Sequence, residues 1–305
     1  MHDKNSLYKA IIEKIPAEKV KIDEPMKNHT SFRIGGPADI LVIPSSTEEL
    51  KAVLQICMKN EIVPYIIGNG TNLLVLDNGI RGVVIKISSN FNYVEFKGSK
   101  VITHAGVLLS ALSRLAMEQS LTGLEFAGGI PGTVGGAVCM NAGAYGGEMK
   151  DIVTRVEVMD LHGNIKVLTN EEMNFGYRRS ILQDGNLIAT KVELQLKEGN
   201  YKEIQDRMNV LNFLRKKKQP LFVPSAGSTF KRPNGYYAGE LIEKAGLKGL
   251  RIRDAQVSEL HAGFIVNVGN ATARDVLELI SEIQRRIKEK YGVELVPEVK
   301  ILGEE

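Results

Sequence analysis

The sequence predicts a mixed α+β fold that is divided into more than one domain. Its 305 residues exceed the size, roughly 250–300 residues, at which a single hydrophobic core stops growing. The first third of the chain alternates strand-like and helix-like apolar patterns, and helical patterns separated by short strand-like runs follow in the last third. Taken alone, the opening strand–helix–strand arrangement fits either an α+β or an α/β first domain.

The first elements are predicted from capping and periodicity. Ser46 and Glu49 have the spacing of a capping box, and the apolar residues that follow recur with the period of a helix. Cys57 lies on the apolar face of this helix, so we expect it to be buried. Strand-like runs occur at residues 38–43, 63–67 and 82–87, and the run at 63–67 is predicted to be a buried strand.

Further elements follow in chain order. Strands are predicted at residues 93–96, 101–105, 153–160, 165–168 and 187–196, with a helix over 108–119. Helices are predicted over residues 201–218, near 239–245, and over 272–291, where Thr272 supplies the N-cap and Gly292 the stop. A strand is expected at 263–268. The final strand, 293–301, carries Pro297, which favours an edge or end position.

Composition and charge restrict the class of protein. An apolar content of 43% and a charged content of 25% are ordinary for a globular protein, and a net charge of +3 is too small to predict a nucleic-acid or membrane partner. No apolar run approaches the roughly 20 residues of a membrane span. Two cysteines cannot build a disulfide framework or a metal site, and the five histidines lack ligand spacing. We therefore expect no metal and a cytoplasmic location.

Two glycine-rich loops indicate a phosphate-bearing ligand. Residues 123–147 contain nine glycines, and Glu125 is the only charged residue among them. Glycine is retained where the backbone needs positive φ or must touch a ligand, and backbone N–H groups are a common means of holding a pyrophosphate. A shorter loop of the same kind, at residues 67–73, follows an apolar run. The alternative is that both loops are structural turns.

Three polar residues stand in apolar or turn contexts that suit chemistry. Arg178 lies in a short polar corner, where a guanidinium either binds a carboxylate through paired hydrogen bonds or forms a surface ion pair. Ser228 lies among small residues, where its hydroxyl either donates a proton or caps a turn. Glu298 follows Pro297 between apolar neighbours and is either exposed or buried.

A basic run at residues 215–218 ends one of the predicted helices. Cations are favoured at a helix C-terminus, so this run has an ordinary explanation, but it also suits a diphosphate. A site for single-stranded nucleic acid would need more interleaved aromatic residues than the two nearby phenylalanines.

Taken together, these segments resemble the UDP-N-acetylenolpyruvoylglucosamine reductases, flavoenzymes that make UDP-N-acetylmuramate for peptidoglycan. The resemblance covers nearly the whole chain and rests on seven motifs in order: HTSFRIGG at 29–36, GNGTNL at 68–73, GGIPGTVGGA at 128–137, NAGAYG at 141–146, YR at 177–178, GSTF at 227–230 and PEV at 297–299. Seven ordered matches are specific, whereas the glycine loop alone would only suggest a flavin fold.

The resemblance implies a fold and a division into domains. It implies noncovalent FAD in a two-subdomain region of the vanillyl-alcohol-oxidase (PCMH) type, followed by a C-terminal α+β substrate domain. The first subdomain is expected at residues 1–90, with strand 293–305 returning to it. The second is expected at 91–205 and the substrate domain at 206–292. The path from Arg178 to Ser228 is filled by predicted elements, so we expect the shorter type of the family, which lacks a tyrosine-bearing lid loop.

The resemblance also implies a reaction and its residues. NADPH reduces FAD, and the reduced flavin passes a hydride to the enolpyruvyl ether. Ser228 is then the proton donor, while Arg178 and Glu298 polarise the enolpyruvyl carboxylate, Glu298 only in its protonated form. Substrate contacts are implied for Tyr145, Arg215, Lys218 and Arg232. FAD contacts are implied for Ile67, Gly68, Asn69, Gly70, Thr71, Asn72, Leu73, Ala127, Gly128, Gly129, Pro131, Gly132, Thr133, Gly135, Gly136 and Ala137.

The resemblance further implies a role in cell-wall synthesis, cell shape and cell division, with small-molecule partners only, and we expect a monomer. Two other enzyme or binding functions stay open at this point. A flavin oxidase of the same fold is one, although neither glycine loop contains the histidine that often attaches flavin in such oxidases. A noncatalytic sugar-nucleotide sensor is the other, and it would not need Ser228 or Glu298.

Overall fold

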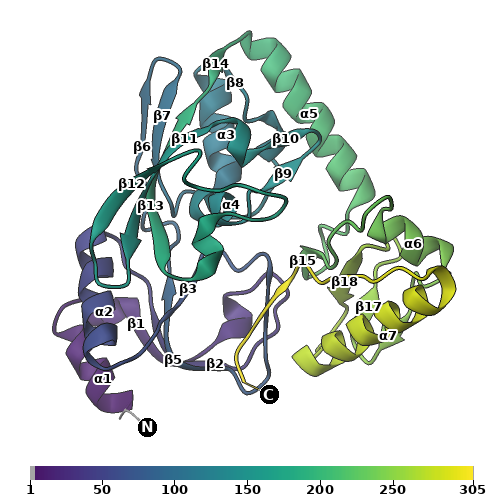
Figure 1. The fold of residues 1–305 in the computed structure, drawn as a ribbon, viewed down its shortest axis with the longest axis horizontal. Helices are drawn as coiled ribbons and strands as arrows, with labels where there is room; N and C mark the ends of the chain where they lie inside the picture. The colour runs from purple at the N-terminus through teal and green to yellow at the C-terminus, as the bar shows by residue number, and fades with distance from the viewer. Residues whose placement is uncertain (1–3, 305) are drawn as a thin grey trace. The chain divides into compact units, whose positions relative to one another are not determined.

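The computed structural model describes residues 4–304, which form two compact units of helices and sheets (Figure 1). Unit 1 comprises the described residues up to Ile22, together with Ile40–Asn69 and Gly82–Arg215. Unit 2 comprises Asp23–Asp39, Gly70–Arg81 and the described residues from Lys216 onward. Unit 2 is therefore assembled from three separated stretches of sequence.

The largest sheet of unit 1 is antiparallel and five-stranded. Its order is β12 (Ile165–Thr169), β11 (Val153–Asp160), β13 (Leu187–Gln195), β7 (Lys100–His104), β6 (Val94–Lys97). All five strands were predicted to within about two residues. Helix α4 (Val134–Cys139) packs on β13 and β7, and the predicted helix at 108–119 is α3, Leu109–Glu118. Two short antiparallel pairs complete this region: β8 (Leu121–Thr122) with β14 (Lys197–Glu198), and β9 (Gly143–Ala144) with β10 (Gly147–Glu148).

A four-stranded sheet contains the strand–helix–strand pattern expected from the sequence. Its order is β1 (Val20–Pro25), β2 (Pro37–Val42), β5 (Ile80–Lys86), β3 (Tyr65–Ile67), and β3 runs parallel to β5. Helices α1 (Lys4–Ile12) and α2 (Thr47–Lys59) contact each other. Cys57 on α2 is fully buried as predicted, and burial raises the pKa of its thiol to about 12.

Two expectations for this region need correction. Ser46 caps α2 by accepting the amide of Glu49 at 3.2 Å, but the Glu49 carboxylate returns to the amide of Ser45 at 2.8 Å instead of closing a capping box. The run at 63–67 is not a buried strand, because Val63 is 67% exposed and Tyr65 is 39% exposed. β3 is an edge strand with β5 as its neighbour, and within β3 the buried residue is Ile67.

Unit 2 contains an antiparallel sheet covered by a long helix. The sheet order is β15 (Ser225–Ser228), β18 (Phe264–Asn267), β17 (Ala255–Val257), β16 (Arg251–Ile252). Helix α7 (Ala273–Tyr291) contacts β16, β17 and α6 (Ala238–Lys244) (Figure 1). Helix α5 (Tyr201–Lys218) leads from unit 1 into this unit, and α5, α6, α7 and β18 confirm predicted elements.

Local signals at the ends of α7 are confirmed. Thr272 and Asp275 form a reciprocal capping box, and Gly292 ends the helix in the left-handed conformation with φ 69°. The carboxylate of Asp77 adds two further acceptors to this N-terminus, for the amides of Ala273 at 2.9 Å and Arg274 at 3.1 Å.

The predicted final strand is too long. Regular pairing is confined to β19 (Lys300–Leu302), which runs parallel to β4 (Leu73–Val75). Pro297 makes an isolated bridge with Phe230, and as a proline it has no N–H to continue a ladder. The core of unit 2 accordingly joins Phe32, Ile34 and Leu74 to apolar residues of the C-terminal third.

Candidate active site

The two predicted phosphate loops meet in unit 1. The side-chain amide of Asn69 donates to the carbonyl of Pro131 at 2.8 Å. A Cβ atom on Gly68 would lie 2.6 Å from Oγ1 of Thr133, so the loops approach closely enough to need glycine at this position. Thr133 also caps α4 by accepting the amide of Gly136 at 3.3 Å.

Several glycines of the long loop are explained by protein contacts. A Cβ atom on Gly135 would lie 2.8 Å from that of Ala105, and one on Gly147 would lie 2.6 Å from the ring of Phe126. In residues 123–147, the described glycines with φ between 20° and 160° are Gly123 and Gly146. Close packing therefore accounts for part of the glycine density that we attributed to a ligand.

Backbone donors in the two loops nevertheless fit a pyrophosphate-bearing group. Within the described part of unit 1, the amides of Gly68, Asn69, Gly129 and Gly132 donate to no backbone carbonyl. Buried or half-buried N–H groups normally find an acceptor. Phosphate oxygens are suitable acceptors, so the loops fit the phosphate part of FAD.

Arg215 on α5 lies against the long loop. A Cβ atom on Gly129 would lie 2.7 Å from Cδ of Arg215, so the arginine side chain packs directly against the loop backbone at this glycine. Burial lowers the pKa of the Arg215 guanidinium, and the phenol of Tyr145 acts in the opposite direction. Arg215 is therefore placed at the glycine loop and is not a solvated residue at the helix end.

Arg178 is presented by a tight turn of unit 1. The backbone groups of Gly176 and Arg179 form two hydrogen bonds, at 3.0 and 3.2 Å, that close the turn around Tyr177 and Arg178. Arg178 has φ 54°, a left-handed conformation that is uncommon for a residue with a side chain. Its Nη2 donates to the carbonyl of Gly143 at 3.2 Å.

Two residues that the sequence reasoning missed hold this turn. Nδ2 of Asn141 donates to the carbonyl of Gly176 at 3.0 Å, and Nε2 of Gln183 donates to the carbonyl of Arg178 at 2.7 Å. Asn141 lies in one of the recognised motifs, but nothing in its local sequence distinguishes a buried connecting side chain from a turn residue.

Ser228 and Glu298 are brought onto neighbouring segments of unit 2. Ser228 ends β15 with an exposed side chain, and the next residue, Thr229, is buried. The amide of Glu298 donates to the carbonyl of Thr229 at 2.8 Å, and Oγ1 of Thr229 accepts the amide of Ile265 at 3.1 Å. The half-buried Glu298 and the exposed Ser228 are thus fixed through their backbones.

The unit 2 part of the short loop is bonded to both segments. Nδ2 of Asn72 donates to the carbonyl of Glu298 at 3.1 Å. The amide of Ser31 donates to the carbonyl of Gly70 at 3.1 Å, and its hydroxyl donates to the carbonyl of Ser225 at 2.6 Å. Gly70 has φ 64°, and a Cβ atom there would collide with the carbonyl of His29, so this position requires glycine.

Two other residues expected at the substrate lie at exposed positions of unit 2. Lys218 is the last residue of α5 and is exposed. Arg232 is also exposed, and its guanidinium lies 4.0 Å from the centroid of the Tyr237 ring. Stacking on an aromatic face restrains a guanidinium that would otherwise be mobile.

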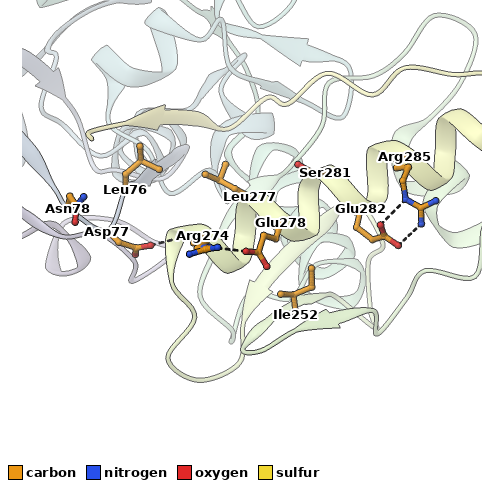
Figure 2. Close-up of a pocket in the computed structure, with 10 residues that line it drawn as sticks. All are labelled: Leu76, Asp77, Asn78, Ile252, Arg274, Leu277, Glu278, Ser281, Glu282 and Arg285. Carbon is orange, nitrogen blue, oxygen red and sulfur yellow. Dashed lines mark hydrogen bonds and ion pairs between the residues drawn. The ribbon is translucent and has the colours of Figure 1, made fainter. Parts of the chain in front are cut away.

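A groove in unit 2 is distinct from these residues (Figure 2). Its charged lining along α7 is largely paired, with Arg274 bonded to Glu278 at 2.9 Å and Arg285 bonded to Glu282 at 2.9 Å. None of the predicted site residues lines it, so it plays no part in the site described above.

Two domain families match the chain, and several relatives resemble it closely over nearly its whole length. The FAD binding domain matches residues 38–169, and the C-terminal domain of UDP-N-acetylenolpyruvoylglucosamine reductase matches residues 219–302. The UDP-N-acetylenolpyruvoylglucosamine reductase of Alkaliphilus oremlandii is 55% identical over 303 residues, covering 99% of this chain and 100% of that protein. This chain belongs to the UDP-N-acetylenolpyruvoylglucosamine reductase family. The reductase of Clostridioides difficile is 55% identical over 300 residues, 98% of each chain.

Solved structures support the same family and fold. The UDP-N-acetylenolpyruvylglucosamine reductase of Thermus caldophilus matches with a TM-score of 0.79 and 42% identity, over 92% of this chain and 97% of that one. A glucose dehydrogenase, Phl p 4.0202, matches 64% of this chain with a TM-score of 0.50 and 13% identity, a likeness of fold alone. The predicted α+β fold, an FAD-binding region of this type with a C-terminal reductase domain, is confirmed.

Membership of the reductase family makes the chain an FAD-dependent oxidoreductase. None of the helices within residues 4–304 combines the length and apolar character needed to cross a membrane. The same residues contain no group of three or more His, Cys, Asp and Glu side chains placed to hold a metal ion.

Proposed function

We propose that this protein reduces the enolpyruvyl ether of UDP-N-acetylglucosamine-enolpyruvate to UDP-N-acetylmuramate, with NADPH as reductant and FAD as cofactor. The observation that carries this proposal is the similarity to named reductases over 98–99% of the chain. The reaction belongs to peptidoglycan precursor synthesis, and through it to cell shape and division.

FAD is held, in this proposal, by the two glycine loops. The short loop contributes Ile67–Leu73, and the long loop contributes Ala127–Gly129, Pro131–Thr133 and Gly135–Ala137. The amides of Gly68, Asn69, Gly129 and Gly132 are the donors that the pyrophosphate would accept. Bound FAD supplies the redox chemistry by which hydride equivalents from NADPH reach the substrate. No residue of either loop is a histidine, so we propose noncovalent binding.

The chain's own task is to stabilise charge and deliver a proton. Hydride addition to the enolpyruvyl ether leaves negative charge on the carbon beside the carboxylate. Arg178 and protonated Glu298 are proposed to bind that carboxylate and draw the charge into it. Ser228 is proposed to give its proton to the carbon. The adjacency of Ser228 and Glu298 in unit 2, through Thr229, supports this division of roles.

The rest of the substrate requires groups that bind a diphosphate and a sugar. We propose Tyr145, Arg215, Lys218 and Arg232 for this purpose. The position of the half-buried Arg215 side chain against Gly129 of the long glycine loop supports its inclusion. We assign FAD binding to residues 1–90 with 293–305 and to 91–205, and substrate binding to 206–292.

Location and assembly complete the proposal. A cytoplasmic monomer with no nucleic-acid partner suits an enzyme whose substrates are nucleotides. The elements between Arg178 and Ser228 suit the shorter type of the family, because β13, β14 and α5 follow one another with short connections.

The decisive experiment is an anaerobic assay of the purified yellow protein. NADPH should bleach the flavin, and adding the enolpyruvyl sugar nucleotide should restore the colour while one equivalent of UDP-N-acetylmuramate forms. Heat or acid should release free FAD. Bleaching without reoxidation by this substrate would exclude the proposed reaction. Reduction of the flavin by an alcohol instead of NADPH would indicate an oxidase.

A further inference from the structure

We propose that Asn141 is a positioning residue for the reduction, because it joins the turn that presents Arg178 to the hairpin that presents Tyr145. This inference rests on the proposed function, in which both side chains face the substrate. Asn141 has 0% exposure, so it acts through its neighbours and not by touching the substrate.

One side of Asn141 holds the Tyr145 hairpin. Its Nδ2 donates to Oε2 of Glu148 at 2.7 Å, and its Oδ1 accepts the amide of Lys150 at 2.9 Å. The hairpin consists of β9 and β10 with Tyr145 and Gly146 at its tip, at φ 53° and 89°. Positive φ at both tip residues is the pattern of a type I′ turn, where a tyrosine is unusual.

The other side of Asn141 holds the Arg178 turn. The same Nδ2 donates to the carbonyl of Gly176, which is also the residue whose two backbone bonds to Arg179 close the turn. The Arg178 guanidinium in turn donates to the carbonyl of Gly143 in the hairpin. One buried amide therefore links the two turns, and Arg178 makes a second link between them.

The backbone of this cluster is strained. Asn141, Tyr145 and Arg178 all have left-handed φ, at 41°, 53° and 54°. Such conformations persist in residues with side chains only where surrounding contacts impose them, and they occur most often at functional sites. Loss of the Asn141 amide removes the contact that both turns share. A shift of about 1 Å in a substrate-binding group is enough to cost roughly 100-fold in rate.

The test begins with Asn141→Asp, which keeps the acceptor for Lys150 and tolerates left-handed φ but removes both donations. We expect FAD content and NADPH-dependent bleaching to match the wild type. We expect kcat/KM for the enolpyruvyl substrate to fall about 100-fold. Equal losses in bleaching and in substrate reduction would overturn the proposal.

A double variant provides the readout that a purely structural role would not give. If Asn141 acts by placing Arg178 and Tyr145, then adding N141D to Arg178→Ala should lower kcat/KM by much less than the roughly 100-fold expected for N141D in the wild type, because the Arg178 part of the loss has already occurred. Losses that multiply would overturn the proposal. Asn170→Ala is the matched control, because its side-chain amide also donates to two carbonyls, of Lys150 and Val153 at 2.9 and 2.6 Å. It should lower thermal stability and change kcat/KM by less than about threefold.

The outcomes separate this inference from the proposed function. An Arg178→Ala variant with full turnover would refute the role of Arg178 itself. Loss of turnover in Arg178→Ala with full turnover in N141D would refute only the positioning role. If N141D does not fold, adding Glu148→Gln gives the new carboxylate a donor and restores the hairpin contact without the bond to Gly176. That protein should fold and keep the 100-fold loss, and wild-type turnover in it would overturn the proposal.

Discussion

The Arg178 turn of unit 1 and the Ser228–Glu298 segments of unit 2 hold their side chains in different ways. The carbonyls of the turn are bonded by two side chains, Asn141 and Gln183. The segments of unit 2 are bonded mainly by their own amides, as in the pairing of Glu298 with Thr229 at 2.8 Å. Single substitutions remove a side-chain donor but leave a backbone ladder intact. Positioning in unit 1 should therefore be the more sensitive to mutation.

The largest loss of turnover is expected from substituting Ser228, the residue of unit 2 that is proposed to donate the proton. Ser228→Ala leaves the backbone of β15 unchanged and removes the proposed proton donor. Turnover of the enolpyruvyl substrate should fall on the order of 10³-fold, about 4 kcal/mol of barrier, with NADPH-dependent bleaching unaffected. Stopped-flow measurement of the two half-reactions checks this.

Two related variants show whether the hydroxyl itself matters. Ser228→Cys should retain part of the activity because a thiol can also donate a proton. Ser225→Ala, in the same strand, should be nearly silent, because Ser225 is bonded to Ser31 through its carbonyl. If Ser228→Ala slows both half-reactions equally, Ser228 has a structural role instead.

A smaller effect is expected from substituting Arg215, whose side chain packs against Gly129 in unit 1. Arg215→Gln removes the cation without cutting the helix, so binding should suffer more than chemistry. We expect KM to rise roughly 10-fold and kcat to change less than threefold, measured by steady-state kinetics in low salt. An unchanged KM would show that this half-buried guanidinium does not bind the substrate.

Asn72→Ala tests whether backbone hydrogen bonds are enough to hold the Ser228 and Glu298 segments of unit 2 in place. It removes the donor to the Glu298 carbonyl, but the bonds from Glu298 to Thr229 and from Lys300 to Asn72 stay, at 2.8 and 2.9 Å. Stability should fall by about 1 kcal/mol in a denaturant titration, and kcat only severalfold. A loss as large as that expected for N141D would show that side chains control positioning in both units.

The smallest effect is expected for the hydrogen exchange of the segment between Arg178 and Ser228 when substrate binds. Residues 186–202 include β13, which is bonded to β11 on one side and β7 on the other, and β14, which pairs with β8. These amides are already protected, so substrate should add little protection in hydrogen exchange. Strong new protection confined to this interval would reveal a lid and contradict the short-type assignment.

The fold was predictable where its signals are local. Thr272 and Gly292 mark α7 because a cap and a left-handed stop each need only one residue of the right kind. The exposure of Tyr65 in β3 was not predictable, because the edge position of β3 depends on which strands pair. The shortening of the last strand was only partly predictable, since Pro297 argues against pairing at one residue and not at its neighbours.

The site was predictable from motifs and not from chemistry alone. Arg178, Ser228 and Glu298 each had an ordinary alternative, and only their order along the chain pointed to a reductase. Asn141 could not be identified from the sequence, because its partners Glu148, Lys150 and Gly176 are 7, 9 and 35 residues away. The glycines that pack against protein groups, such as Gly135, are equally hard to separate from those that leave amides for a ligand.

The bond between Asn72 and Glu298 joins residues 226 positions apart, and the paired residues of β4 and β19 beside it are 227 positions apart. A ribosome adding 5–20 residues per second needs roughly 10 to 45 s to cover that interval. During this time Phe32, Ile34 and Leu74 have left the exit tunnel without the apolar partners that complete their core. Newly made chains should therefore depend on chaperones that shield apolar segments. A stop codon before Leu295, which removes Leu295 and Val299 from this core, should prevent this unit from maturing.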